Sequence, residues 1–416
     1  MRNRIPAYSI YLIIQGSFGM FFTMMALVSA IYRVESAGLD PLQLVLVGTV
    51  LETTVFVFEI PTGIVADVYS RRLSVVIGYL LIGLGFILEG ALPVFATILL
   101  AQAIWGFGYT FISGAEQAWL ADEVGEDQLA NIYLRGSQIA QVGTLLGIVT
   151  ATALGTLGLN LPILLGGALI LALGIFLAIF MPEGGFSPTP AAERHTWREA
   201  RQTLSTGLRT VHGRPMLILM MLIALIYGLS SEGLDRLWQA HFLANISFPT
   251  LGDLEPVVWF GLIGVGQMVL TIGAAEFLKR RVQVENQRAA VNALLIVNGI
   301  VVGALIWFGL SRTFLAATAS IWTIQVMRQS GGALYGAWLN KGLKSEARAT
   351  ILSINGQADA VGQIVGGPIV GALALRFGLR AAMVAVALML SPVLALYARA
   401  LALLGREPAS VDQEVA

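Results

Sequence analysis

Long runs of apolar residues, separated by short polar stretches, follow one another along almost the whole chain. Four examples are residues 44–57, 73–88, 161–181 and 291–310. A helix that crosses a lipid bilayer needs about 20 mostly apolar residues, whereas the strands of a membrane barrel alternate polar and apolar positions. Because segment after segment shows neither this alternation nor a polar face, the pattern predicts an all-α membrane protein.

Twelve segments have the length and the apolar content of a membrane-spanning helix. The first is too long for the core of a signal peptide and has no clear small-residue cleavage site after a short core, so we interpret it as a span that is kept. An even number of spans puts both chain ends on one side of the membrane. The predicted spans are 6–32, 42–66, 73–92, 95–121, 130–157, 160–181, 214–243, 256–278, 288–310, 313–340, 349–375 and 379–404.

Lysine and arginine are distributed unequally between the loops on the two sides. One side holds the N-terminal arginines, the pair Arg71 and Arg72, and the basic residues between spans 6 and 7, whereas the other side holds only a few, such as Arg33. Because basic residues mark cytoplasmic loops, the sequence predicts that both termini and the loop between spans 6 and 7 lie in the cytoplasm.

Composition narrows the class of protein further. Hydrophobic residues make up 56% of the chain and charged residues only 12%, against about 25% charged in soluble proteins. The net charge of zero gives no basic field for nucleic acid, and the absence of cysteine excludes disulfides and thiolate metal sites. The histidines are scattered, and neither a phosphate-binding loop nor a catalytic triad is present. We therefore expect no enzyme, no catalytic residue, no cofactor and no metal site.

The chain divides into two similar halves. We expect a six-helix half at 1–182, a cytoplasmic linker at 183–213, a second six-helix half at 214–405 and a tail at 406–416. The linker places Trp197, Leu204 and Leu208 at helical spacing, which is typical either of an amphipathic helix on the inner leaflet or of an ordinary solvated linker. At one constant offset, residues 118–120, Gly143 and Gly147 match residues 337–339, Gly362 and Gly366. Such a parallel repeat predicts a substrate cavity between the halves, near the middle of the membrane.

A charged decapeptide, residues 63–72, lies between spans 2 and 3. Gly63, Asp67 and Arg71 are spaced four residues apart, and Arg72 follows. The arginines alone could be cytoplasmic markers, but that rule does not require a glycine and an acid at fixed spacing. A degenerate counterpart occurs in the second half at 273–281, where the basic cluster is kept and the acid is displaced.

With twelve spans, a cytoplasmic middle loop and this decapeptide, nearly the whole chain resembles the major facilitator superfamily, and residues 58–63 resemble its bacterial drug-efflux members. The resemblance implies that the decapeptide latches the two halves in the outward-facing state. Asp67 would then face the start of span 11, and Arg72 would serve lipid headgroups or stiffen the loop. Arg71 would pair with an acid at the inner end of span 4, either Asp122 or Glu123.

The chain departs from the family pattern in two places. Many proton-coupled members carry an arginine in span 4 where this chain has Gln102, which puts proton coupling through that arginine in doubt. The glycine-rich antiporter signature of span 5 is present only as Gly143 and Gly147, without its proline. A closer match occurs in span 11, for which we consider both a gating role and ordinary small-residue packing. It consists of Gly362, Gly366, Gly367 and Pro368.

Ionisable residues inside the spans are the candidate transport residues, because a charge in a span is costly and usually functional or paired. The resemblance implies that spans 1, 4, 7 and 10 line the cavity. Arg328 of span 10 is then the best cavity charge, with Asp359 or Glu52 as its expected counter-ion. An acid in a water-poor cavity can exchange a proton for substrate near neutral pH, and we expect this of Glu52 and Asp359. The remaining candidates near these residues are Glu59, Asn355, Trp105 and Trp322, where the tryptophans could stack on a ligand or face lipid.

Other charged residues have a structural interpretation. Glu89 and Glu116 lie toward span ends, where we expect them to reach interfacial water. Glu232, Asp235 and Arg236 cluster in span 7, where a local network is plausible.

The resemblance thus implies a secondary active transporter of the bacterial inner (plasma) membrane that works by alternating access, with proton-coupled efflux of small apolar or amphipathic compounds as its first expected function. Its expected partners are a small-molecule substrate, protons and membrane lipids, and it is expected to act as a monomer. The alternatives are an uptake or lipid-export transporter of the same fold, or a membrane sensor that does not transport.

Overall fold

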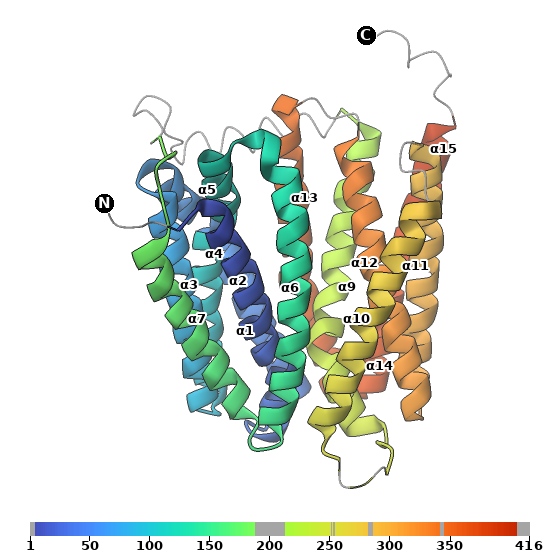
Figure 1. The fold of residues 1–416 in the computed structure, drawn as a ribbon. Helices are drawn as coiled ribbons and strands as arrows, with labels where there is room; N and C mark the ends of the chain where they lie inside the picture. Colours follow the sequence, from blue (N-terminus) through green and yellow to red (C-terminus); the bar gives the residue numbers. More distant parts are fainter. Residues whose placement is uncertain are drawn as a thin grey trace. The chain divides into compact units, whose positions relative to one another are not determined.

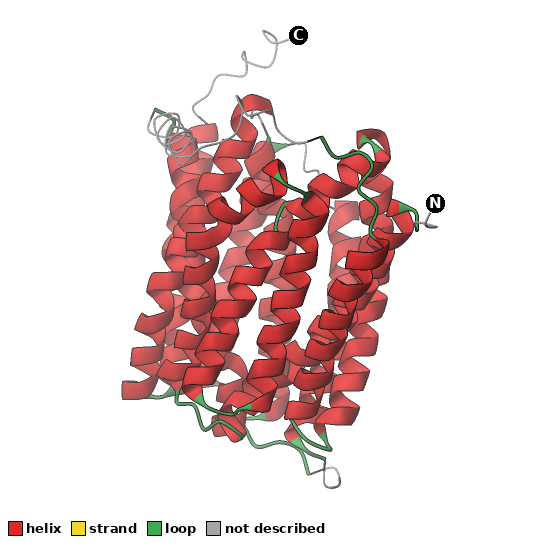
Figure 2. Cartoon of the chain, turned by 90° about the vertical axis from the view of Figure 1, so that its left-hand side faces the viewer, coloured by secondary structure: helices red, strands yellow, loops and turns green. Residues whose placement is uncertain are grey.

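The computed structural model describes residues 5–187, 213–250, 252, 254–281, 286–341 and 345–405. Almost all of these residues are helical, and short loops join the helices at their ends (Figure 2). The chain forms two compact units, which comprise 1–200 with 250–265 and 201–249 with 266–416. The expected amphipathic helix of the linker lies outside the described residues.

The first unit contains seven helical elements that run side by side (Figure 1). They are α1 (Ala7–Glu35), α2 (Pro41–Val68), α3 (Arg71–Ala91), α4 (Phe95–Ile112), α5 (Ala115–Val124), α6 (Glu126–Gly155) and α7 (Asn160–Phe180). Within this unit α1 packs mainly against α6, and α3 against α4 and α7.

The second unit is also built of helices joined by short loops in its described part. Its elements are α9 (Pro215–Asn245), α10 (Pro256–Arg281), whose first residues belong to the first unit, α11 (Gln287–Leu310), α12 (Phe314–Asn340), α13 (Ser345–Phe377), α14 (Leu379–Leu390) and α15 (Pro392–Leu404). Here α9 packs mainly against α13, and α11 against α12.

Eleven of the described helical segments are long and apolar enough to cross a membrane, with α4 and α5 counted together, as are α14 and α15. The twelfth segment, α12, is more polar because it carries Arg328 among glutamine, serine and asparagine side chains. Large apolar side chains such as Leu315 and Leu146 face outward, with 78% and 51% exposure, which suits contact with lipid and not with water. The predicted all-α membrane fold is confirmed.

Local sequence explains where these helices begin and end. Asp40 and Gln43 form a reciprocal capping box at the start of α2, and the Ser70 side chain accepts a hydrogen bond from the Leu73 backbone N–H at the start of α3. The decapeptide therefore spans a helix break, with Gly63 and Asp67 in α2 and Arg71 and Arg72 in the first turn of α3.

The glycines of the sequence repeat lie where two helices approach closely. A Cβ added at Gly143 of α6 would overlap the Gly16 backbone oxygen of α1, and one added at Gly147 would overlap that of Met20. In the second unit, a Cβ at Gly362 or Gly366 of α13 would overlap the backbone of α9 at Leu225 or Leu229. Both units thus join their first and fifth membrane segments by glycine-mediated contact.

Candidate functional site

A cavity of about 260 Å³ lies within the second unit. This volume has room for a small molecule or for part of a larger one. Its polar lining comes from four helices, α9, α12, α13 and α15, and its remaining lining is small or aliphatic. The lining residues are Ile223, Ala224 and Tyr227 of α9, Arg328, Gly331, Gly332 and Tyr335 of α12, Asn355, Gly356 and Asp359 of α13, and Tyr397 of α15.

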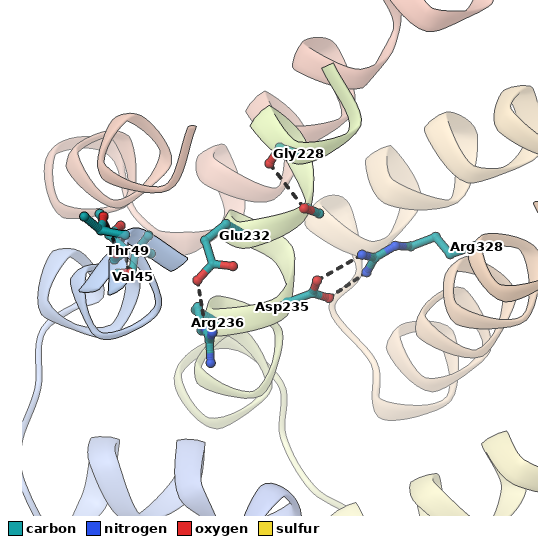
Figure 3. A network of polar contacts seen from close by, with 9 residues as sticks. Val45, Thr49, Gly228, Glu232, Asp235, Arg236 and Arg328 are labelled. Carbon is teal, nitrogen blue, oxygen red and sulfur yellow. Dashed lines mark hydrogen bonds and ion pairs between the residues drawn. The ribbon is translucent and has the colours of Figure 1, made fainter. Parts of the chain in front are cut away.

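Arg328 makes a two-pronged ion pair with Asp235 of α9 (Figure 3). Its Nη1 and Nη2 atoms lie 2.6 and 2.9 Å from the two carboxylate oxygens. This geometry matches the planar guanidinium to the planar carboxylate and is the strongest form of such a pair. Asp235 is 42% exposed and Arg328 21% exposed at their side chains, so the Asp235 carboxylate is open to water or to a ligand.

Within the second unit, the expectation that Asp359 is the counter-ion of Arg328 is wrong, because Asp235 takes that place, whereas the alternative with Glu52 stays a prediction. Asp359 instead accepts a 2.7 Å hydrogen bond from Gln363, one turn along its own helix. The depth of a residue along its span did not predict the partner of Arg328, because the long arginine side chain carries its charge far from its own backbone position.

Arg328, Asn355 and Asp359, three of the sequence candidates, are nevertheless brought together at the cavity wall. Asn355 donates a 2.7 Å hydrogen bond to the Tyr335 hydroxyl. Tyr335 in turn donates to the Met220 backbone oxygen at 2.8 Å. These bonds hold the amide and the phenol in place and tie α12 and α13 to α9.

Sequence reasoning missed the tyrosines of this cavity. Tyr227 donates a 2.5 Å hydrogen bond to Asn298 of α11, and Tyr397 is fully buried in the middle of α15. A signal was present in α12, because Arg328, Gly331 or Gly332, and Tyr335 recur at the spacing of one helical face. Tyr397 offered no comparable pattern.

The expected network of Glu232, Asp235 and Arg236 divides into two pairs (Figure 3). Arg236 donates from Nε to Glu232 at 2.7 Å, one turn along α9. Asp235 points to a different side of α9 and binds Arg328. Adjacent residues on a helix point about 100° apart, which explains the division.

The remaining membrane candidates do not belong to this cavity. Glu52 is partly buried and Glu59 exposed, both on α2 of the first unit. Trp105 of α4 packs its ring 5.7 Å from Phe22 and 5.3 Å from Phe86, within an aromatic cluster. Trp322 of α12 packs closely on Gly266 of α10, leaving no room there for a Cβ.

The arginines of the decapeptide have defined contacts within the first unit. Arg71 forms an ion pair with Asp122 of α5, donates a 2.6 Å hydrogen bond to the Ala118 backbone oxygen and lies over the Phe186 ring. Glu123, the alternative partner, instead accepts a 2.7 Å hydrogen bond from the Gly185 backbone N–H.

The other members of the decapeptide differ in exposure. Arg72 donates from its backbone N–H to Glu183 at 2.9 Å and from its side chain to the Ala178 backbone oxygen. Asp67 is exposed. The side chains at the start of α13, which Asp67 is expected to face, are among those that the structure does not describe.

Glu89 corrects an expectation, because it does not reach interfacial water. It is fully buried and paired with Arg33 of α1, whose Nη2 lies 2.7 Å from Glu89 Oε1. Gln102 donates a 2.7 Å hydrogen bond to the other carboxylate oxygen. Gln102, which stands where the resemblance leads us to expect an arginine, thus helps to hold a buried ion pair. The guanidinium of this pair belongs to Arg33 of α1.

Glu116 also lies away from water, at 6% exposure. Its carboxyl oxygens accept hydrogen bonds from Gln15 of α1 at 2.7 Å and from Tyr79 of α3 at 3.0 Å. The helix is interrupted at Ser113 and Gly114, between α4 and α5. The sequence prediction treated this part of the chain as one continuous span and did not anticipate the burial of Glu116.

Comparison with known proteins agrees with this architecture. The family model of the Major Facilitator Superfamily matches residues 10–354. The uncharacterized MFS-type transporter YxaM of Bacillus subtilis (strain 168) is 25% identical over 368 residues, which are 87% of this chain and 88% of that protein.

Solved structures share the fold at low sequence identity. The nucleoside transporter NupG superposes with a TM-score of 0.70 at 12% identity, over 97% of this chain and 100% of NupG. A bacterial homologue of the human lysosomal transporter Spinster, inward-facing and unoccupied, gives 0.73 at 16% identity, over 97% and 99%. The peptide transporter POT in complex with sulfate gives 0.73 at 15% identity, over 96% and 95%. With most of its length matched by the family model, this chain belongs to the Major Facilitator Superfamily, as a multi-pass membrane transporter.

Proposed function

We propose that the protein is a secondary active transporter of the bacterial inner membrane that exports small amphipathic compounds in exchange for protons. In this proposal both termini are cytoplasmic, the chain acts as a monomer, and residues 1–182 and 214–405 rock against each other around the substrate. The observation that carries the proposal is the cavity of the second unit, which combines Arg328, Asn355 and Asp359 with tyrosine side chains.

Asp359 is the first candidate for the proton-exchanging acid. It lines the cavity, and its hydrogen bond comes from the neutral amide of Gln363. The guanidinium of Arg328 is already engaged by Asp235. A carboxyl group so placed can hold either a proton or a polar group of the substrate, which is the competition that exchange requires. Glu52 of the first unit is the second candidate.

The lining supports an amphipathic substrate. Tyr227, Tyr335 and Tyr397 offer aromatic surface together with hydroxyl groups, and Arg328 and Asn355 add a charged and an amide group to the wall. The export direction rests on residues 58–63, whose sequence resembles drug-efflux members of the family. Uptake or lipid export by the same fold is the alternative, and a sensor without transport is the second.

The decapeptide supports a cycling transporter over a sensor. Arg71 is held by Asp122 and by the Ala118 backbone within the first unit, which leaves Asp67 exposed at the end of α2. We propose that these residues form a latch that closes in one state of the cycle and opens in the other.

The test combines export in cells with transport in vesicles. Expression in an efflux-deficient host should lower the sensitivity of the cells to some toxic amphipathic compounds, and an imposed pH gradient should drive the same compounds across vesicles that contain the protein. Asp359→Asn should abolish gradient-driven transport, whereas Glu126→Gln, an exposed acid at the start of α6, should not. Full gradient-driven transport in both Asp359→Asn and Glu52→Gln would contradict proton exchange at these acids, and no sensitivity change for any compound would favour the alternatives.

A further inference from the structure

Glu116 is a buried acid whose hydrogen-bond partners in the described structure are both neutral. Gln15 donates to Oε1 and Tyr79 to Oε2, and both partners belong to other helices than Glu116. In the described part of the chain no arginine or lysine forms an ion pair with it. An isolated ionised carboxylate is costly in such a place, whereas a neutral carboxylic acid is not.

Glu116 can be protonated in this structure without any change in the packing around it. The tyrosine hydroxyl can accept as well as donate, so that the protonated Glu116 can donate to Tyr79 across the same 3.0 Å. The other ionisable groups close to Glu116 are Tyr11 of α1 and Tyr133 of α6, which are neutral at physiological pH. Among the described residues, α2 and α4 add no charged partner, and the nearest cation bound to α5 is Arg71, at Asp122.

The helix that carries Glu116 is a short unit between two glycine turns. Gly114 before α5 and Gly125 after it have φ values of 77° and 81°, a backbone conformation that glycine adopts at no cost and other residues avoid. The same helix binds Arg71 through Asp122 and the Ala118 backbone oxygen. One ten-residue helix therefore joins the buried acid to the arginine of the decapeptide.

We propose that Glu116 is a proton-binding site of the first unit, and that loss of its proton shifts α5 and weakens the contacts of Arg71. When the proton leaves, the negative carboxylate must be stabilised by water or by a positive charge. In our proposal Glu116 reaches either of them by a movement of α5 about Gly114 and Gly125. The step is a proton transfer to water with no other bond changed. The link to transport rests on the proton-driven function proposed above, whereas the protonation of Glu116 does not.

Infrared difference spectroscopy of the full chain in lipid vesicles tests the proton site directly. At neutral pH the spectrum of the unmodified protein minus that of Glu116→Gln should contain a carboxylic acid C=O band, which should disappear on raising the pH. Glu126→Gln is the control, because Glu126 is an exposed acid of the same unit, at the start of α6, and it should remove no such band. If Glu116→Gln fails to fold, Tyr79→Phe should shift the frequency of the band instead. Absence of the band at neutral and mildly acidic pH overturns the proposal.

The absence of cysteine in the natural chain allows the movement of α5 to be tested separately. Ala121→Cys places a single thiol on this helix, at a half-buried position. Its labelling by a water-soluble maleimide, divided by that of a Gln128→Cys reference on the exposed start of α6, should rise several-fold from mildly acidic to mildly alkaline pH. The rise should vanish when Glu116→Gln is added. A rise that survives Glu116→Gln, or no rise at all, overturns the link to α5. Neither spectrum nor labelling requires transport, so a failure of this inference is distinct from a failure of the proposed function.

Discussion

Arg33 of α1 and Glu89 of α3 form an ion pair inside the first unit, with 2.7 Å between Arg33 Nη2 and Glu89 Oε1 and no exposure of the Glu89 side chain. The pair is completed by Gln102 of α4, which donates to the second carboxylate oxygen, and by the Tyr32 hydroxyl, which donates to the Glu89 backbone oxygen. Three helices are thus fixed to one buried carboxylate.

Glu89→Gln should destabilise the protein strongly. The substitution leaves the Arg33 guanidinium buried without its carboxylate, and removal of one partner of a buried pair costs about 3–5 kcal/mol. Thermal unfolding of the purified protein in detergent measures this loss, with Glu126→Gln on the surface expected to change stability by less than about 0.5 kcal/mol. The double variant Arg33→Met with Glu89→Leu should recover much of the loss, since well-packed apolar residues often replace buried pairs without cost. Equal unfolding temperatures for Glu89→Gln and Glu126→Gln would contradict a structural role for the pair.

Gly362→Ala should damage the packing of α13 on α9. An added methyl group would overlap the Leu225 backbone oxygen, and overpacking in a tight interface costs about 1–3 kcal/mol. Gly303→Ala on α11 is the matched control, because a Cβ there meets nothing within 4 Å and alanine favours the helix. The yield of monodisperse protein and its unfolding temperature check the prediction. A Gly362→Ala protein as stable as Gly303→Ala would show that the interface relaxes.

The helices and their order were predictable because a membrane-spanning helix can be recognised in a sequence from its length and its apolar content alone. The predicted limits of α7, 160–181, differ from the observed Asn160–Phe180 by one residue. The break between α4 and α5 was not foreseen. It depends on a positive φ at Gly114, and nothing in the residues around that glycine distinguishes it from the many glycines inside spans.

Partner choice among buried charges was less predictable than the helices. The sequence placed Arg328 and Asp359 in one cavity, but it did not show that Asp235 reaches Arg328 or that Arg33 reaches Glu89. Both pairs join helices far apart in the chain, so their formation depends on helix rotation and rotamer, which composition and spacing leave open.

Asp235→Asn should uncouple the ion pair at the cavity. The guanidinium of Arg328 then keeps its charge but loses its counter-charge and one of the two oxygens that accept its hydrogen bonds. A double-mutant cycle with Arg328→Gln should give an interaction energy of about 0.5–3 kcal/mol, the range for residues in direct contact. Thermal unfolding of the two single variants and the double variant supplies the cycle. If the stability losses of the two single variants add up to that of the double variant, the ion pair contributes no interaction energy to stability.

Asp122→Asn should slow transport by weakening the hold of α5 on Arg71. The loss of a charge-assisted contact worth about 1.4 kcal/mol corresponds to roughly a tenfold lower rate. Arg71→Lys should behave similarly, because lysine keeps the charge but not the planar fork that also reaches the Ala118 oxygen. Vesicle transport rates measure both variants, and Asp127→Asn, exposed at the start of α6, serves as the control. Normal rates in Asp122→Asn and Arg71→Lys would refute the latch.

The residues that follow α7 bind α3 and α5, the two helices that the Arg71–Asp122 ion pair also joins. Glu183 accepts hydrogen bonds from Ser70 and from the Arg72 backbone at the start of α3, and the Gly185 N–H binds Glu123 at the end of α5. Residues 183–185, where the connection between the two halves begins, are therefore hydrogen-bonded to the end of the decapeptide and to α5. In the proposed latch, a pull on residues 183–185 would act directly on Ser70, Arg72 and Glu123, the immediate neighbours of the Arg71–Asp122 ion pair.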